Sequence, residues 1–169
     1  MFNRKNNVLL VMTLLIALGA ASTASAGGSI FVGADFPTGG FGDVGKTGFT
    51  AGGYYTGSLL PIVELGGLVS YNDFSTDFGD LPEAERIFGD SINAWEIHAL
   101  GQLNIVFLKA FLGLGFANHN LAADRSTDFS WQIGAAIDLM MLEIRLGYHQ
   151  IPVDESSINW MKLTIGLTF

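Results

Sequence analysis

The chain has 169 residues, of which 49% are hydrophobic, and its mean hydropathy of +0.39 is too high for a disordered protein. It contains no cysteine, which excludes disulfides, thiolate metal sites and a cysteine nucleophile. The formal net charge of −8 argues against a nucleic-acid partner, because phosphate binding needs a basic face.

Residues 1–26 have the pattern of a cleaved secretory signal peptide. A basic start is followed by an apolar stretch over residues 8–21 and by small residues that end in an Ala24-x-Ala26 cleavage site. A retained membrane anchor is the alternative, but the apolar stretch is shorter than the ~20 residues that a spanning helix needs. Residues 27–169 are predicted to form one domain.

After the signal peptide, apolar residues alternate with polar or small ones, which is the period of a β-strand whose two faces meet different surroundings. The pattern is clearest at the end of the chain, where every odd position from Met161 to Phe169 is apolar. The alternation predicts eight strands, in chain order over residues 30–36, 49–56, 63–71, 95–104, 108–117, 129–139, 142–149 and 159–169.

The predicted connections between these strands alternate in length. Tight turns fall near residues 57–60, 104–107 and 139–141, and longer, more polar loops cover residues 37–45, 72–92, 118–127 and 151–156. Short turns at one end and long loops at the other are typical of an outer-membrane barrel. The sequence therefore predicts an all-β fold, an eight-stranded antiparallel up-and-down transmembrane β-barrel.

Aromatic residues on the apolar face gather at the long-loop ends of seven strands. Aromatic rings favour the membrane interface, where an apolar body and a polar edge are both accommodated. A general preference of aromatic residues for strands is the alternative, but it does not predict clustering at matching ends. The predicted aromatic girdle consists of Phe36, Phe49, Tyr71, Trp95, Phe116, Phe129, Trp131 and Tyr148.

The mixed face is predicted to line the interior, which in an eight-stranded barrel is just wide enough for side chains to fill. Buried charges of both signs must be paired or hydrated, so we expect a hydrogen-bonded network that plugs the lumen. The pairing within it depends on strand stagger and stays open. Its ionisable members are Asp35, Glu64, Glu96, His98, Lys109, Asp138, Glu143, Arg145, His149 and Lys162.

On these features the chain resembles the small eight-stranded outer-membrane barrels of Gram-negative bacteria, the OmpA/OmpX-like β-barrel domain. The resemblance covers residues 27–169 and includes Gly-rich alternating strands such as Gly113-Leu114-Gly115-Phe116. It implies a monomer in the outer membrane, surrounded by lipid and lipopolysaccharide. The closing strand looks like the family's signal for the barrel-assembly machinery, the implied partner in biogenesis. That assembly signal consists of Met161, Leu163, Ile165, Leu167 and Phe169.

Catalysis, metal binding and cofactors are not predicted. None of His98, His119 and His149 lies in the His-x-Ser arrangement of the lipid A deacylase barrels. The palmitoyltransferase barrels carry an amphipathic helix ahead of the first strand, but here only about three residues separate the predicted cleavage site from that strand. Ser130 and Asp128 could meet His119 near the outer rim, but such a group near one loop is commonplace. His98 and His149 are expected to be hydrogen-bonding groups of the lumen, since no His/carboxylate spacing recurs.

The longest predicted loop, residues 72–92, carries six acidic residues and one basic residue, Arg86. A solvated loop that keeps the surface hydrophilic is favoured over a binder of cations or of a basic partner, and no EF-hand spacing is present. The sequence therefore favours a non-enzymatic barrel with a plugged lumen that serves envelope integrity or surface interaction. A narrow channel for ions or small apolar molecules is the alternative, and a lipid-modifying enzyme is the third possibility.

Overall fold

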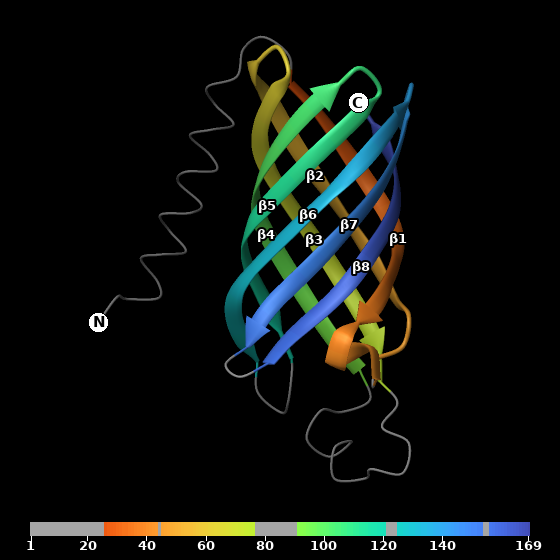
Figure 1. The fold of residues 1–169 in the computed structure, drawn as a ribbon, viewed down its shortest axis with the longest axis vertical. Coiled ribbons are helices and arrows are strands. Elements are labelled where there is room, and N and C mark those ends of the chain that lie inside the picture. The colour runs from red at the N-terminus through yellow and green to blue at the C-terminus, as the bar shows by residue number, and fades with distance from the viewer. Residues whose placement is uncertain (1–25, 44, 77–90, 121–124, 154–155) are drawn as a thin grey trace, which may run out of the picture.

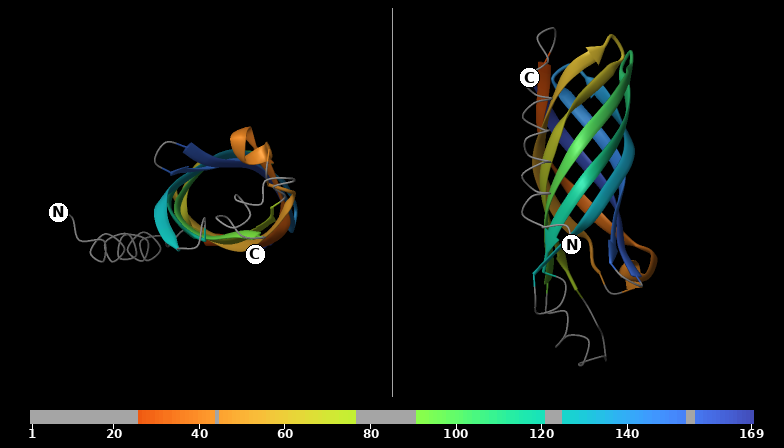
Figure 2. Two further views of the ribbon diagram at one scale, coloured as in Figure 1. Left: turned by 90° about the horizontal axis from the view of Figure 1, so that it is seen from below. Right: turned by 90° about the vertical axis from the view of Figure 1, so that its left-hand side faces the viewer.

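The predicted fold is confirmed: the computed structural model is one closed antiparallel barrel (Figure 1). It describes residues 26–43, 45–76, 91–120, 125–153 and 156–169. Each strand pairs with the next, and the last pairs back with the first, so the sheet forms the ring seen from below in Figure 2. The strands are β1 (Ala26–Thr38), β2 (Gly48–Leu60), β3 (Val63–Ser75), β4 (Ser91–Ile105), β5 (Leu108–His119), β6 (Ser126–Leu139), β7 (Leu142–Val153) and β8 (Ser156–Thr168).

A short 3₁₀ helix, η1 (Gly39–Asp43), follows β1 at the long-loop end of the barrel, the lower end in Figure 1. Within the described ranges, no helix has the length and apolar character needed to cross a membrane. The first 25 residues, which carry most of the predicted signal peptide, lie outside the described part of the chain.

Several predicted loop boundaries are wrong, because the strands run further than the alternation of apolar residues indicated. The ladder between β3 and β4 continues to Ser75 and Ser91, inside the predicted loop 72–92. β6 begins at Ser126, and the predicted loop 151–156 is largely strand at the ends of β7 and β8. Backbone pairing needs no apolar residue on the outer face, so hairpins extend past the lipid-facing pattern. Residues 77–90 of the predicted loop, which include Arg86, lie outside the described residues.

The β2–β3 turn also differs from its predicted place at residues 57–60. Leu60 pairs with Val63, so the turn consists of Pro61 and Ile62, after an irregularity in register between Ser58 and Leu60. Proline lacks a backbone N–H and is readily accommodated in a turn. The other two tight turns are Val106-Phe107 and Met140-Met141, within the predicted ranges.

The two faces of the sheet separate as the alternation predicts. On β6, Ile133 is half-exposed on the outside while its neighbour Gln132 is buried inside. Two inward glycines make the tight inner packing possible. A Cβ atom on Gly115 would lie 1.9 Å from the Ile97 carbonyl oxygen, and one on Gly66 would lie 1.9 Å from the Tyr55 carbonyl oxygen. No side chain fits at these positions, because the backbone of the adjacent strand lies too close.

Candidate functional site

The lumen of the barrel holds the side chains singled out by the sequence, arranged in successive layers. β4 crosses every layer in order from the long-loop end, through Ile92, Glu96, Leu100 and Gln102, each of which is buried. The layers alternate between apolar and charged character, and each of them is described below in this order.

The first layer is an apolar cluster at the long-loop end, which we call the outer cap. The Phe41 ring from η1 meets the Phe74 ring at 5.2 Å between centroids, and Phe74 meets Trp160 at 5.5 Å, both edge to face. The helix η1 thus places an aromatic ring over the lumen. The outer cap consists of Phe41, Phe74, Ile92, Ala94, Ala117, Ile151, Ile158 and Trp160.

The second layer is centred on Glu96, whose side chain is fully buried. Its Oε2 atom lies 3.3 Å from Lys162 Nζ and accepts hydrogen bonds from Ser70 Oγ at 3.0 Å and Asn72 Nδ2 at 2.9 Å. A carboxylate with one cation and two neutral donors is well compensated for burial. Because β4 and β8 are not neighbours in the sheet, the Glu96–Lys162 pair bridges the lumen.

Two histidines and a second acid complete this Glu96 cluster (Asp35, Ser70, Asn72, Glu96, His98, His149 and Lys162). His149 Nδ1 lies 3.5 Å from Glu96 Oε2, and the His149 ring stacks on Trp160 of the outer cap. His98 contacts Ser130 Oγ at 2.6 Å and Gln132 Nε2 at 2.8 Å. Asp35 is opposite Lys162 in the β1–β8 ladder, yet neither of its carboxylate oxygens has a hydrogen-bond partner among the described residues.

The third layer is an inner apolar ring, which consists of Phe31, Tyr54, Leu68, Leu100 and Phe111. Arg145 inserts its guanidinium group between two of these rings, 4.3 Å from the Tyr54 centroid and 4.2 Å from the Phe111 centroid. A cation held between two aromatic faces is stabilised by both ring quadrupoles and excludes water from its faces.

The fourth layer is the Glu143 cluster (Tyr54, Lys109, Asp138, Glu143 and Arg145), at the short-turn end. Glu143 Oε2 accepts a hydrogen bond from Tyr54 Oη at 2.6 Å and one from Lys109 Nζ at 3.0 Å. Arg145 Nε lies 3.4 Å from the other oxygen of Glu143, and Lys109 also pairs with Asp138 at 2.9 Å. Glu143 is fully buried, so these contacts compensate its charge inside the barrel.

Glu64, also predicted for the charge network, has neutral donors instead of an ion pair in the described part of the chain. It accepts hydrogen bonds from Thr56 Oγ1 at 2.8 Å, Asn104 Nδ2 at 2.7 Å and Gln102 Nε2 at 3.2 Å. The Gln102 carboxamide accepts from Arg145 Nη2 at 2.6 Å, and so links Glu64 to the Glu143 cluster.

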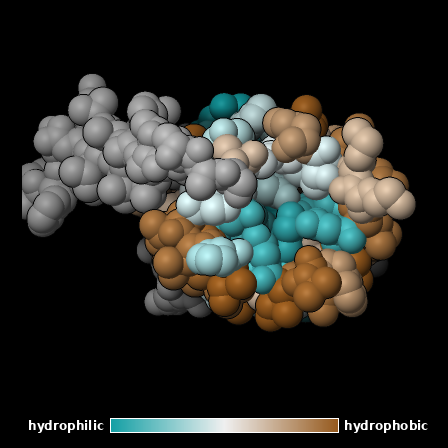
Figure 3. Space-filling model, turned by 90° about the horizontal axis from the view of Figure 1, so that it is seen from above, coloured by the Kyte–Doolittle hydropathy of each residue, from teal (hydrophilic) through white to brown (hydrophobic). Residues whose placement is uncertain are grey.

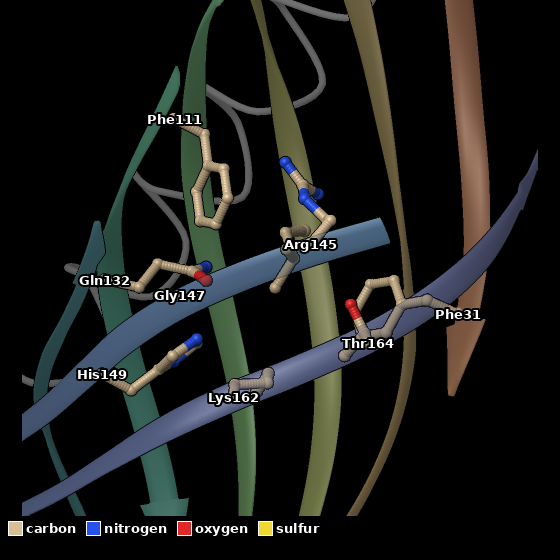
Figure 4. A pocket seen from close by; sticks show the side chains of 9 residues that line it. Phe31, Phe111, Gln132, Arg145, Gly147, His149, Lys162 and Thr164 are labelled. Atoms are coloured by element: carbon tan, nitrogen blue, oxygen red, sulfur yellow. The ribbon is translucent and has the colours of Figure 1, made fainter. Parts of the chain in front are cut away.

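A small cavity remains between the two charged layers (Figure 4). The volume of this cavity that the centre of a water molecule can occupy is about 10 Å³, close to the minimum needed to hold a single water. Arg145, His149 and Lys162 line it together with rings of Phe31 and Phe111. The cavity is far smaller than pockets that hold drug-sized ligands.

At the long-loop rim, His119 and Asp128 meet as the sequence allowed, but the serine beside them is Ser126. Ser130 instead contacts His98 in the lumen. His119 Nε2 lies 2.9 Å from Asp128 Oδ2 and 3.3 Å from Ser126 Oγ, and Ser126 also donates to Asp128. In a catalytic triad the acid and the nucleophile contact opposite nitrogens of the imidazole, whereas here both contact the same nitrogen.

Across the described residues, no group of three or more His, Cys, Asp or Glu side chains is arranged to hold a metal ion.

The predicted girdle residues lie on the outer face, where Tyr71 and Trp95 are directly paired, as are Phe116 and Phe129. Their ring centroids are 5.0 Å and 6.5 Å apart, and the Trp131 and Tyr148 rings are 5.7 Å apart. The remaining two, Phe36 and Phe49, are half-exposed on β1 and β2. The strand β8 contributes Met161, which pairs with Phe36 on one side and Tyr148 on the other.

The odd residues of the predicted assembly signal, from Leu163 to Leu167, are half-exposed on the outside of β8. Phe169 follows this strand and exchanges two backbone hydrogen bonds of 3.0 Å with Gly28, which closes the barrel at the short-turn end.

Sequence reasoning missed several residues that fill the lumen. Phe41, Asn72, Phe74 and Ile92 were assigned to loops, although Asn72 donates to Glu96 and the other three belong to the outer cap. For Asn72, Phe74 and Ile92, the signal is the continued alternation at even positions on β3 and β4, past the last aromatic residue of the outer face; Phe41, in η1, has no such signal.

No protein-family model and no curated protein sequence matches this chain. Solved structures do resemble it. The attachment invasion locus protein Ail of Yersinia pestis aligns with a TM-score of 0.57 and 13% identity over 86% of this chain and all of that one. The N-terminal β-barrel domain of Pseudomonas aeruginosa OprF aligns with a TM-score of 0.53 and 16% identity, over 85% of this chain and 97% of that one. Neisserial surface protein A aligns with a TM-score of 0.51 and 14% identity, over 85% of this chain and 94% of that one. The likeness shows a shared fold, that of small eight-stranded outer-membrane barrels.

Proposed function

We propose that this chain is a non-enzymatic protein of the outer membrane of a Gram-negative bacterium, with a lumen closed by its own side chains. The observation that carries the proposal is the series of four filled layers between the two ends of the barrel. Trp160, Phe74, Leu100 and Phe111 leave almost none of their surface to solvent, and the intervening charged layers bridge the lumen. A hydrated ion has no continuous path through such packing.

Apolar residues around the outside of the barrel support the membrane location. Ile30, Leu112, Ile133, Leu146 and Ile165 are each half-exposed or more, and they come from five different strands. A soluble protein would bury such residues, while a barrel in lipid exposes them at no cost. Lipid and lipopolysaccharide are accordingly the surroundings that we propose, and the barrel-assembly machinery is the proposed partner for insertion.

The proposed role is envelope integrity or surface interaction through the loops at the η1 end. The longest connection there is acidic, which favours a basic partner and disfavours a polyanion. One solved structure of Ail contains a heparin analogue, sucrose octasulfate. Because heparin is a polyanion, we expect the present chain not to be retained on heparin resin at physiological ionic strength. Retention would argue against the proposal that the acidic loop selects a basic partner.

Conductance in planar bilayers tests whether the lumen is closed. The purified full chain is expected to give no steady current in KCl. A variant that combines Phe74→Ala and Trp160→Ala in the outer cap with Phe31→Ala and Phe111→Ala in the inner apolar ring opens both apolar layers and should conduct. Leu112→Ala is the matched control, because Leu112 follows Phe111 on β5 but faces outward. Folding of each variant is checked first by its heat-dependent mobility on a gel. Steady single-channel current from the unaltered chain would replace this proposal with the narrow channel.

A further inference from the structure

The short-turn end of the barrel is unusually apolar at the very tips of its turns. All three turns expose large apolar side chains, and Val106 and Met140 are 95% and 97% exposed. Seen from this end, apolar residues form the lower and right-hand parts of the rim around a polar centre (Figure 3). The exposed residues of the three tips are Leu59, Leu60, Ile62, Ile105, Val106, Phe107, Leu139, Met140, Met141 and Leu142.

The charged residues closest to these tips all point into the lumen. Lys109 pairs with Asp138 and Glu143, and Glu64 accepts hydrogen bonds from inward side chains such as Asn104. The tips are therefore continuous with the lipid-facing surface of the strands, with no charged residue between them in the described part of the chain.

The length of this apolar surface matches the hydrocarbon of an outer membrane. From Trp95 in the aromatic girdle to Ile105 at the turn, β4 advances by ten residues. At ~3.3 Å per residue and a tilt of about 40°, ten residues span roughly 25 Å along the membrane normal, the height of the apolar band of such barrels. An aromatic girdle at the membrane surface thus leaves the turn tips at the opposite boundary of the hydrocarbon.

One backbone carbonyl in each turn has a hydrogen-bond partner within the barrel. The carbonyl oxygens of Ile62, Phe107 and Met141 accept hydrogen bonds from backbone N–H groups on the next hairpin or strand, at 2.8 Å, 2.9 Å and 2.9 Å respectively. Met140 O accepts a further bond from Thr168 Oγ1 at 3.3 Å. These bonds continue the strand ladders into the turns. Because an unpaired carbonyl is costly in lipid, they make these carbonyls compatible with an apolar surrounding.

The conformation of two tips favours other residues than those present. Val106 and Met140 have φ of 57° and 60°, and both occupy the first central position of a two-residue hairpin turn. Glycine is preferred at such a position, and a β-branched residue such as valine is strained there. Val106 and Met140 therefore occupy these positions at a conformational cost. An apolar surrounding, which favours their side chains over glycine, explains why they are found there.

We infer that the three turn tips are immersed among the acyl chains of the adjacent membrane leaflet, and hold the barrel at a fixed depth. The inference rests on the proposed membrane location and specifies which surface of the chain binds lipid. The barrel then fits the bilayer asymmetrically: the loop end extends into water beyond the girdle, and the turn end lies among the acyl chains.

Single-cysteine spin labelling tests this inference directly, because the chain has no native cysteine. Met140→Cys and Val106→Cys report on the tips. Ile133→Cys, half-exposed on β6, is the lipid reference. Gly40→Cys is the water reference, since Gly40 is exposed in η1 and a Cβ atom there meets nothing within 4 Å. Each full-chain variant carries a nitroxide in phosphatidylethanolamine/phosphatidylglycerol vesicles, and its collisions with oxygen and with a water-soluble nickel chelate are measured.

The labels at Met140 and Val106 are expected to collide several-fold more with oxygen than with the nickel chelate, as at Ile133, while the label at Gly40 shows the reverse. Values at both tips equal to those at Gly40 would overturn the inference while leaving the membrane location intact. Water-like values at Ile133 as well would instead overturn the proposed function. Low collision rates with both reagents, together with spin–spin broadening, would show a second copy covering the tips and would also overturn lipid immersion.

Discussion

Arg145→Met removes the cation that connects the inner apolar ring with the Glu143 cluster. The substitution keeps a long flexible side chain, so it removes charge and hydrogen bonds while largely filling the space. Arg145 is 4% exposed, donates to Gln102 at 2.6 Å, and lies about 4 Å from two ring centroids. Loss of one partner of a buried ion pair costs about 3–5 kcal/mol.

The expected cost for Arg145→Met is at the lower end of this range, about 3 kcal/mol. Glu143 retains two of its contacts, the hydrogen bonds from Tyr54 and Lys109, so its charge is not left alone. Arg145→Lys is the matched control. It retains the charge but loses the planar group between the rings, and should cost less than the methionine variant.

The assay is urea unfolding of the full chain in lipid vesicles, followed by the fluorescence of its three tryptophans and by circular dichroism. A double-mutant cycle with Glu143→Gln measures the coupling between the two residues. We expect the double variant to be at least ~1.5 kcal/mol more stable than the sum of the single changes predicts. A cost of less than ~1 kcal/mol for Arg145→Met, or additive single changes, would refute the view that this cluster stabilises the barrel.

Three further predictions concern the sheet and its closure. Gly115→Ala should cost about 3 kcal/mol or more in the same unfolding assay, because its Cβ atom would lie 1.9 Å from a backbone oxygen. Gly101→Ala, whose Cβ atom would have its nearest neighbour at 3.6 Å, should change the free energy of unfolding by less than ~1 kcal/mol. Equal costs would contradict the close approach at Gly115. Ile133→Arg places a charge in hydrocarbon and should cost roughly 2–4 kcal/mol, clearly more than Ile133→Ala; the opposite order would place this residue inside the barrel. Deletion of Phe169, which is 72% exposed, should lower the outer-membrane yield in cells while refolding into vesicles changes little; a normal yield would argue against an assembly signal.

The alternation of apolar residues determined much of this protein before any tertiary contact was known. It separated the inner from the outer face of the sheet on all eight strands, because side chains of a strand point to opposite faces with a strict period of two. It also placed the turns at one end and the loops at the other, with an error at Pro61 and at several loop boundaries. The errors at the loop boundaries share a cause, because beyond the apolar band the outer face carries fewer apolar residues and the pattern weakens while backbone pairing continues.

Only the tertiary structure decided which lumen residues meet. Glu96 pairs with Lys162 across the barrel, and Tyr54 on β2 donates to Glu143 on β7. Such contacts join strands far apart in sequence, and their heights depend on the tilt and stagger of the closed sheet, which no local pattern encodes. The hydrogen bonds of the turn carbonyls also became known only from the structure, because each carbonyl accepts from the strand that follows its own hairpin and the stagger between the strands decides whether they meet.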